Sequence, residues 1–94
     1  MIIEQPQYLY VRLEEPDEDG ITALVAYGMP ASDGDVVYLI IRYFDYEKYS
    51  VQGDHLYISF NEAMDDVFKD YALTRNDWRE LTAEEIMRID ARFS

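Results

Sequence analysis

The 94-residue chain contains no cysteine and only one histidine, His55, and these shortages exclude several kinds of chemistry. Without cysteine there is no disulfide framework, no thiolate nucleophile and no cysteine-ligated zinc site. With a single histidine, most acid–base and nucleophilic arrangements lack their central residue. We therefore expect a non-catalytic protein that holds neither a cofactor nor a metal ion.

Long hydrophobic runs are missing as well. No segment approaches the roughly 18 consecutive apolar residues that a membrane-spanning helix needs. Residues 1–6 lack a basic segment followed by an apolar stretch, which argues against a signal peptide. We therefore expect a soluble cytoplasmic protein, and a reducing compartment suits a chain without cysteine.

Positive charge is scarce, whereas negative charge is abundant. The chain has 20 Asp and Glu but only 8 Lys and Arg, which gives a formal net charge of -12. Since a magnitude of about 2–8 is enough to keep a small domain soluble, this excess favours a basic partner and repels anionic membranes. Arg12 is the only basic residue in the first 41 positions, so direct binding to nucleic acid is not expected.

The abundant apolar residues, 49% of the chain, predict a folded protein, and 94 residues suffice for a single domain over residues 1–94. Alternating apolar and polar residues predict strands over 7–13, 21–27, 36–44 and 55–59. The third of these is apolar on both faces, so we expect it to be central in the sheet and covered on both sides. In the fourth, Leu56 and Ile58 are expected to point inward.

The spacing of apolar residues then changes to that of an amphipathic helix over residues 60–72. Ser59 and Glu62 have the spacing of a capping box at its start. Thr82 and Glu85 repeat this spacing and predict the start of a terminal helix.

Between the two helices, Trp78 is expected to anchor a short helical turn over residues 74–81. The predicted order is four strands followed by two helices, ββββαα. This order favours an α+β fold in which an antiparallel four-stranded sheet has both helices packed on one face.

An acidic segment over residues 14–20 is expected to form an exposed hairpin loop, because it ends in glycine and contains proline. When Glu15 is aligned with the first ligand of an EF-hand, Gly20 falls correctly, but the twelfth ligand would be Ala26 in a predicted strand. The EF-hand interpretation therefore fails, and loose calcium binding is left as the alternative to a solvated loop. The candidate partner-binding residues here are Glu14, Glu15, Asp17, Glu18 and Asp19.

A second acidic row lies on the polar face of the first helix, at Glu62, Asp65, Asp66 and Asp70. The first three lie near the helix N-terminus, where the helix dipole stabilises them. Asp70 lies in the last turn, four residues after Asp66, a like-charge spacing that costs about 0.2–0.5 kcal/mol. The row is thus either a binding surface or a solvated face.

Tyrosine is unusually frequent, with nine residues. Tyr46 and Tyr49 lie in a connection beside acids, and their stiff rings with one polar end are typical of interfaces. We expect them to contact the partner. Packing against the sheet is the alternative, and it is the interpretation favoured for Tyr27 and Tyr71.

The segment over about residues 55–80 resembles the closing part of many small bacterial immunity proteins. The matching residues are Tyr57-Ile58-Ser59-Phe60, Glu62-Ala63, Asp70-Tyr71 and Asp77-Trp78. Those proteins are acidic α+β domains that bind and neutralise a toxin, often a nuclease. The net charge is also similar to that of phage-encoded anti-restriction and anti-CRISPR DNA mimics. The resemblance implies an inhibitor, and it assigns no target-binding residue.

These observations favour a bacterial or phage inhibitor that occludes a positively charged, nucleic-acid-binding surface of a nuclease toxin or a defence complex. Duplex DNA carries one negative charge per about 1.7 Å of axis, and carboxylates can occupy a site built for phosphates. Two alternatives remain open: a structural or homo-oligomeric accessory protein that uses an aromatic surface, and a carboxylate-based enzyme of unrecognised type.

Overall fold

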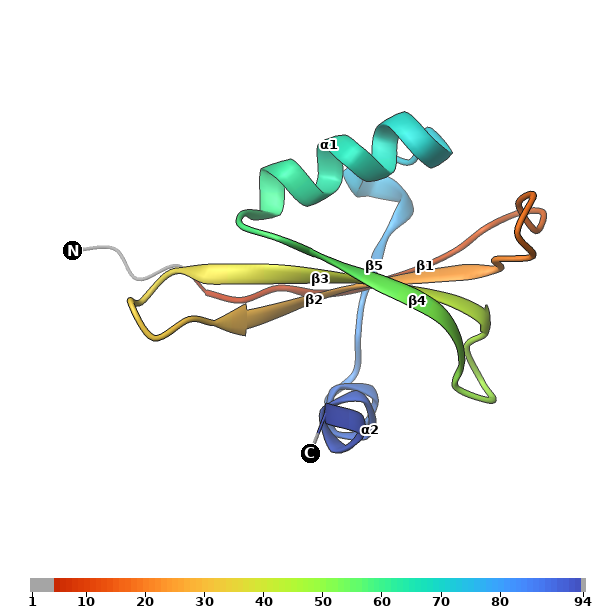
Figure 1. Ribbon diagram of the computed structural model, residues 1–94. Coiled ribbons are helices and arrows are strands. Elements are labelled where there is room, and N and C mark those ends of the chain that lie inside the picture. The colour runs from red at the N-terminus through yellow and green to blue at the C-terminus, as the bar shows by residue number, and fades with distance from the viewer. Residues whose placement is uncertain (1–4, 94) are drawn as a thin grey trace.

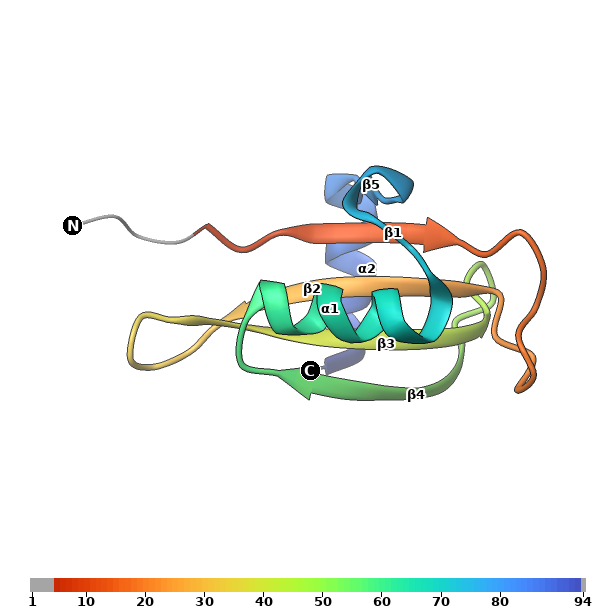
Figure 2. The same cartoon turned by 90° about the horizontal axis from the view of Figure 1, so that it is seen from above.

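Five antiparallel strands form one sheet in the order β4-β3-β2-β1-β5 (Figures 1 and 2). The computed structural model describes residues 5–93. The strands are β1 (Tyr8–Arg12), β2 (Ala23–Pro30), β3 (Val36–Asp45), β4 (Ser50–Tyr57) and β5 (Arg79–Glu80). Two helices follow the first four strands, α1 (Phe60–Tyr71) and α2 (Ala83–Phe93), with a 3-10 turn at Arg75–Asp77. The α+β class is therefore confirmed.

The prediction of four strands is wrong by one, because β5 adds a fifth. β5 pairs with β1 through Leu9↔Glu80 and Tyr10↔Arg79. Its two residues are both charged and exposed, so they show no alternation of apolar and polar side chains. A strand of this length is defined by its neighbour rather than by its own sequence.

The prediction that both helices pack on one face is also wrong. Figure 1 shows α1 above the sheet and α2 below it, with β5 carrying the chain past the edge from one face to the other. The cause lies in β2 and β3, which bury side chains on both faces. A sheet with two apolar faces requires cover on each.

Two apolar layers result. The layer under α1 contains Leu9, Val11, Ile21, Leu24, Ala26, Val36, Tyr38, Ile40, Ala63, Val67 and Trp78. The layer over α2 contains Ala23, Val25, Tyr27, Leu39, Ile41, Tyr43, Leu81 and Ile89. As predicted, β3 contributes alternate residues to both layers, although β2 rather than β3 is the middle strand.

The helices begin at the predicted caps, although of the two capping-box bonds expected at α1 one forms. The Ser59 hydroxyl accepts a hydrogen bond from the Glu62 amide at 3.1 Å. At α2 both bonds of the capping box form, from the Thr82 amide to Glu85 Oε1 (2.9 Å) and from the Glu85 amide to Thr82 Oγ1 (3.2 Å). Trp78 directly follows the 3-10 turn and is 6% exposed. Its buried side chain therefore anchors this turn, as predicted.

The expectation that Leu56 and Ile58 point inward is wrong, since they are 55% and 77% exposed. Leu56 lies opposite Leu39 on the face that α2 covers. However, β4 is the edge strand, and the α2 layer includes no residue of β4. Neither helix, within residues 5–93, is long and apolar enough to cross a membrane.

Candidate functional site

The acidic loop and α1 meet on one side of the molecule. The Tyr71 hydroxyl at the end of α1 lies close enough to the Asp17 carboxylate in the loop for each group to shift the pKa of the other. A hollow of about 430 Å³ between the two segments is lined by Glu14, Glu15 and Asp77 among others. Residues 14–19 and 60–77 together hold ten of the twenty carboxyl side chains but two of the eight basic ones. We call the predicted set Glu14, Glu15, Asp17, Glu18, Asp19, Glu62, Asp65, Asp66 and Asp70 the acidic face.

The loop connects β1 to β2 as a hairpin, as predicted, and Asp17 shapes it. Asp17 Oδ1 accepts hydrogen bonds from the amides of Asp19 and Ile21, both at 2.9 Å. Burial alone would raise the pKa of Asp17, but these amides and the Tyr71 hydroxyl together hold it below its usual value. Asp17 therefore stabilises the conformation of the loop, whereas Glu14, Glu15, Glu18 and Asp19 are exposed to solvent.

One acid of α1 is likewise bound within the protein. Asp66 Oδ2 accepts a 2.5 Å hydrogen bond from the Tyr57 hydroxyl on β4. Glu62, Asp65 and Asp70 are exposed. Their carboxylates make no ion pair or hydrogen bond with the part of the chain that the structure describes. Three of the four predicted acids on this helix are thus free to meet a partner.

Tyr46 lies on the other side of the sheet, in the α2 layer. Its ring centroid is 4.5 Å from that of Tyr10 and 5.1 Å from that of Tyr43. Its hydroxyl donates to Glu85 Oε2 at 2.6 Å. Burial, and then this bond to a carboxylate, raise the pKa of Tyr46. Tyr46 therefore packs within the protein, away from the acidic face.

Tyr49 stands beside Tyr46 and is held by α2. Its hydroxyl accepts a 3.0 Å hydrogen bond from Arg88, and the Arg92 guanidinium lies 4.8 Å from its ring centroid. Its φ of 54° is unusual for a residue with a side chain, so the contacts hold a strained turn. The structure does not bring the two tyrosines together with the acidic loop and α1.

Two arginine–glutamate ion pairs lie on the α2 side. Among residues 5–93, the ion pairs are Arg79–Glu85 at 2.9 Å and Arg88–Glu84 at 3.1 Å, and both involve α2. The hydrogen bonds from Arg79, above all, lower the pKa of Glu85 to about 2. The Arg79 guanidinium also lies 4.4 Å from the Tyr10 ring centroid. No carboxylate of the acidic face has such an ion pair within residues 5–93.

Sequence reasoning missed one feature that links the tyrosines to the acids. Within residues 5–93, four tyrosine hydroxyls interact with carboxylates, and two of these interactions involve each helix. The pairs are Tyr57–Asp66 and Tyr71–Asp17 at α1, with Tyr46–Glu85 and Tyr27–Asp90 at α2. The only sequence signal was the joint excess of tyrosine and acid, because no pair has a helical or strand spacing.

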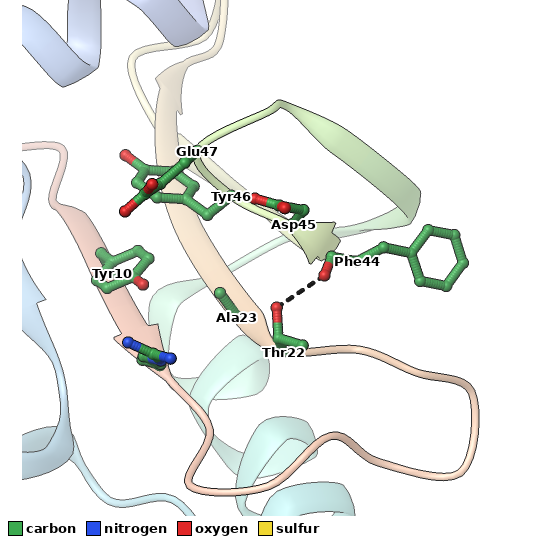
Figure 3. A pocket seen from close by; sticks show the side chains of 8 residues that line it. Tyr10, Thr22, Ala23, Phe44, Asp45, Tyr46 and Glu47 are labelled. Atoms are coloured by element: carbon green, nitrogen blue, oxygen red, sulfur yellow. Dashed lines mark hydrogen bonds between the residues drawn. The ribbon is translucent and has the colours of Figure 1, made fainter.

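A further hollow of about 340 Å³ lies near the hairpin ends on the α2 side (Figure 3). Asp45 and Glu47 line it, and the Phe44 ring points away from it. No group of three potential metal-ligating side chains occurs within residues 5–93. The pKa values of the Asp17 and Glu85 carboxyl groups are both lowered, the opposite of what a general acid needs.

Comparisons with protein-family models, with curated proteins and with solved structures found no match. The resemblance to immunity proteins therefore stays a prediction.

Proposed function

We propose that this protein is a non-catalytic inhibitor whose acidic face binds a positively charged surface on a protein partner. The partner is a nuclease toxin or a nucleic-acid-binding defence complex, and the inhibitor excludes nucleic acid from it. One observation carries the proposal. Within residues 5–93, the carboxylates of the acidic face have no cationic partner in an ion pair, whereas the arginines of β5 and α2 are already engaged with tyrosines and acids.

The physical effect of such a face is steering. A surface of one charge sign raises the association rate with an oppositely charged partner by roughly 10–10³, and the gain falls steeply with salt. A row of carboxylates on a helix also offers acceptors to lysine and arginine side chains that otherwise bind phosphates. Binding through this face would therefore compete directly with nucleic acid.

The apolar part of the proposed contact comes from α1 itself. Phe68 is 55% exposed and lies one turn after Asp65 on the same helix. An exposed aromatic ring beside free carboxylates is suited to burial in a hot spot with a charged rim. Tyr46 is bound to Glu85 and Tyr49 to Arg88, so the proposed contact does not require these tyrosines.

In the first step of the test, the protein is immobilised and incubated with host extract at low salt. Bound proteins are then eluted at high salt. Capture alone does not decide the question. The purified partner is then loaded with duplex DNA, and we expect the protein to displace the DNA, with an inhibition constant that weakens at least tenfold between about 50 and 300 mM salt.

Matched variants separate the acidic face from total charge. Asp65→Asn/Asp70→Asn removes two charges from α1, and Glu80→Gln/Glu84→Gln removes two from the α2 side. We expect at least a tenfold loss of displacement for the first pair and less than twofold for the second. Equal losses, or displacement that does not respond to salt, would contradict the proposal.

A further inference from the structure

The edge strand β4 is long and carries few of the features that keep sheet edges from pairing. It has eight residues, whereas β5, the strand at the other edge, has only two, both charged. No strand within residues 5–93 pairs with the outer side of β4 (Figure 2). Edge strands are normally blocked by lysine, proline or bulges. β4 contains neither lysine nor proline, and Asp54 is its one acid. Register shifts affect only the pairing at its start, so residues 53–57 form a regular edge.

The two faces of this edge differ in chemistry. On the α2 side, Val51 and Leu56 are 46% and 55% exposed. A hollow of about 410 Å³, lined by Val51, Asp54 and Ile89 among others, separates β4 from α2. The apolar side chains of β4 on this face are therefore left partly uncovered.

On the α1 side, the edge lies beneath carboxylates. Tyr57 faces α1, and its hydroxyl is held by Asp66 at 2.5 Å. Asp70 is close enough for its charge to contribute to the raised pKa of Tyr57. Arg42 is the basic residue of this part of the face, and its Nε is engaged with Gln52 Oε1 at 2.8 Å.

A strand added to β4 would continue the pleat, so its side chains would alternate between these two faces. One set would lie beside Asp66 and Asp70, and the other beside Leu56. We propose that β4 pairs with an extended segment of the basic partner in which lysine or arginine alternates with apolar residues. This inference rests on the proposed function and names the part of the partner that is bound.

A second copy of this chain fits the edge less well. Antiparallel pairing of β4 with its own copy places a two-fold axis perpendicular to the joined sheet, so each face continues into the same face. The two α1 helices would then lie on the same side of the joined sheet, with Asp66 and Asp70 of both copies close to the junction. Like charges placed in this way repel, whereas a basic strand is attracted.

The probe is a capped nine-residue peptide of alternating lysine and valine, titrated into the full-length protein. Two control peptides have the same composition: one carries N-methyl groups on alternate residues, which block strand pairing, and one has its lysines and valines in separate blocks. We expect binding of the first peptide to slow amide hydrogen exchange at alternate positions within residues 53–57. Both controls should bind at least tenfold more weakly.

A pair of exposed apolar residues supplies the matched variants. Leu56→Lys places a lysine on the edge, whereas Met87→Lys makes the same change on α2, where Met87 is 71% exposed. We expect at least a tenfold weaker peptide affinity for the first and less than a twofold change for the second. Both should fold, because neither side chain is buried.

Three results would overturn the inference. The first is salt-dependent binding with equal affinity for the N-methylated peptide, which would leave the proposed function intact. The second is no binding of the alternating peptide, and the DNA-displacement assay still tests the proposed function separately. The third is a dimer in sedimentation, at twice 11.1 kDa, with residues 53–57 protected before any peptide is added.

Discussion

The hydroxyl of Tyr57 on β4 donates a 2.5 Å hydrogen bond to Asp66 on α1, and so ties a helix to the edge strand of the sheet. Three further tyrosine–carboxylate contacts join a helix to an inner strand or to a loop of the sheet, one more at α1 and two at α2. Both compositional excesses of this chain, in tyrosine and in acid, therefore have a partly shared structural cause. Seven acids of the acidic face, all but Asp17 and Asp66, are not engaged in this way, and the proposed function depends on them.

A double-mutant cycle should detect the Tyr57–Asp66 bond. Tyr57→Phe and Asp66→Asn should each lower the free energy of unfolding by about 1 kcal/mol, and their effects should couple by about 0.5–1 kcal/mol. Urea unfolding of the four proteins gives the coupling. The matched cycle of Tyr57→Phe with Asp65→Asn should show none, because Asp65 is exposed and not bonded to Tyr57. Equal coupling in both cycles would contradict the assignment.

Alkaline pH should destabilise the fold through these tyrosines. Burial, and then the bond to Asp17, raise the pKa of Tyr71 to about 12 from 10.0, and burial raises the pKa of Tyr43 to about 12. Because the folded state holds these protons more tightly, their contribution to stability is complete below pH 10 and is lost as the pH rises to about 12. Urea unfolding at pH 8.5, 10 and 11.5 measures the loss.

Tyr71→Phe provides the control for that titration. It removes one titrating hydroxyl, so the fall in unfolding free energy between pH 10 and 11.5 should be smaller than in the wild type. Lysine side chains also lose their positive charge over this pH range. The resulting increase in repulsion between carboxylates is the same in both proteins. An identical fall in the two proteins would show that Tyr71 is not involved.

Much of this fold was predictable because its signals are local. Alternation located the first three strands, and the Thr82/Glu85 spacing predicted a capping box that forms in full. What failed depends on the position of distant elements. Period-two alternation placed Leu56 on the correct side of its strand but could not say that α2 stops short of it.

The candidate site shows the same division between local and distant information. The acids at 14–19 and on α1 stand out in the sequence itself, as an acidic run and as the polar face of a helix. The bonds that engage the tyrosines were not, since Tyr46 is 39 residues from Glu85 and Tyr27 is 63 from Asp90. Such pairs become visible only once the order of the strands and the face covered by each helix are known.

Acid should destabilise the α2 side through Glu85. The hydrogen bonds from Arg79, above all, lower the pKa of Glu85 to about 2 from 4.5. A depressed pKa means that the stabilisation is complete above pH 4.5 and is lost as the pH falls toward 2. Glu85→Gln should therefore cost about 1–3 kcal/mol at pH 7 and should have a flatter stability curve between pH 5 and 2.5. Glu84→Gln, at an exposed ion pair, should cost less than about 0.5 kcal/mol.

Asp70→Lys should separate stability from binding. Asp70 lies in the last turn of α1, where the helix dipole disfavours an acid, and four residues after Asp66. A lysine there should raise the free energy of unfolding by about 0.5–1 kcal/mol at low salt. The gain should shrink at 1 M salt, where the Debye length is about 3 Å. Urea unfolding at both salt concentrations measures this gain.

If the acidic face binds a basic partner, the Asp70→Lys variant should displace DNA from that partner at least tenfold less effectively. A variant that is more stable and equally inhibitory would show that Asp70 is a solvated acid outside the binding surface.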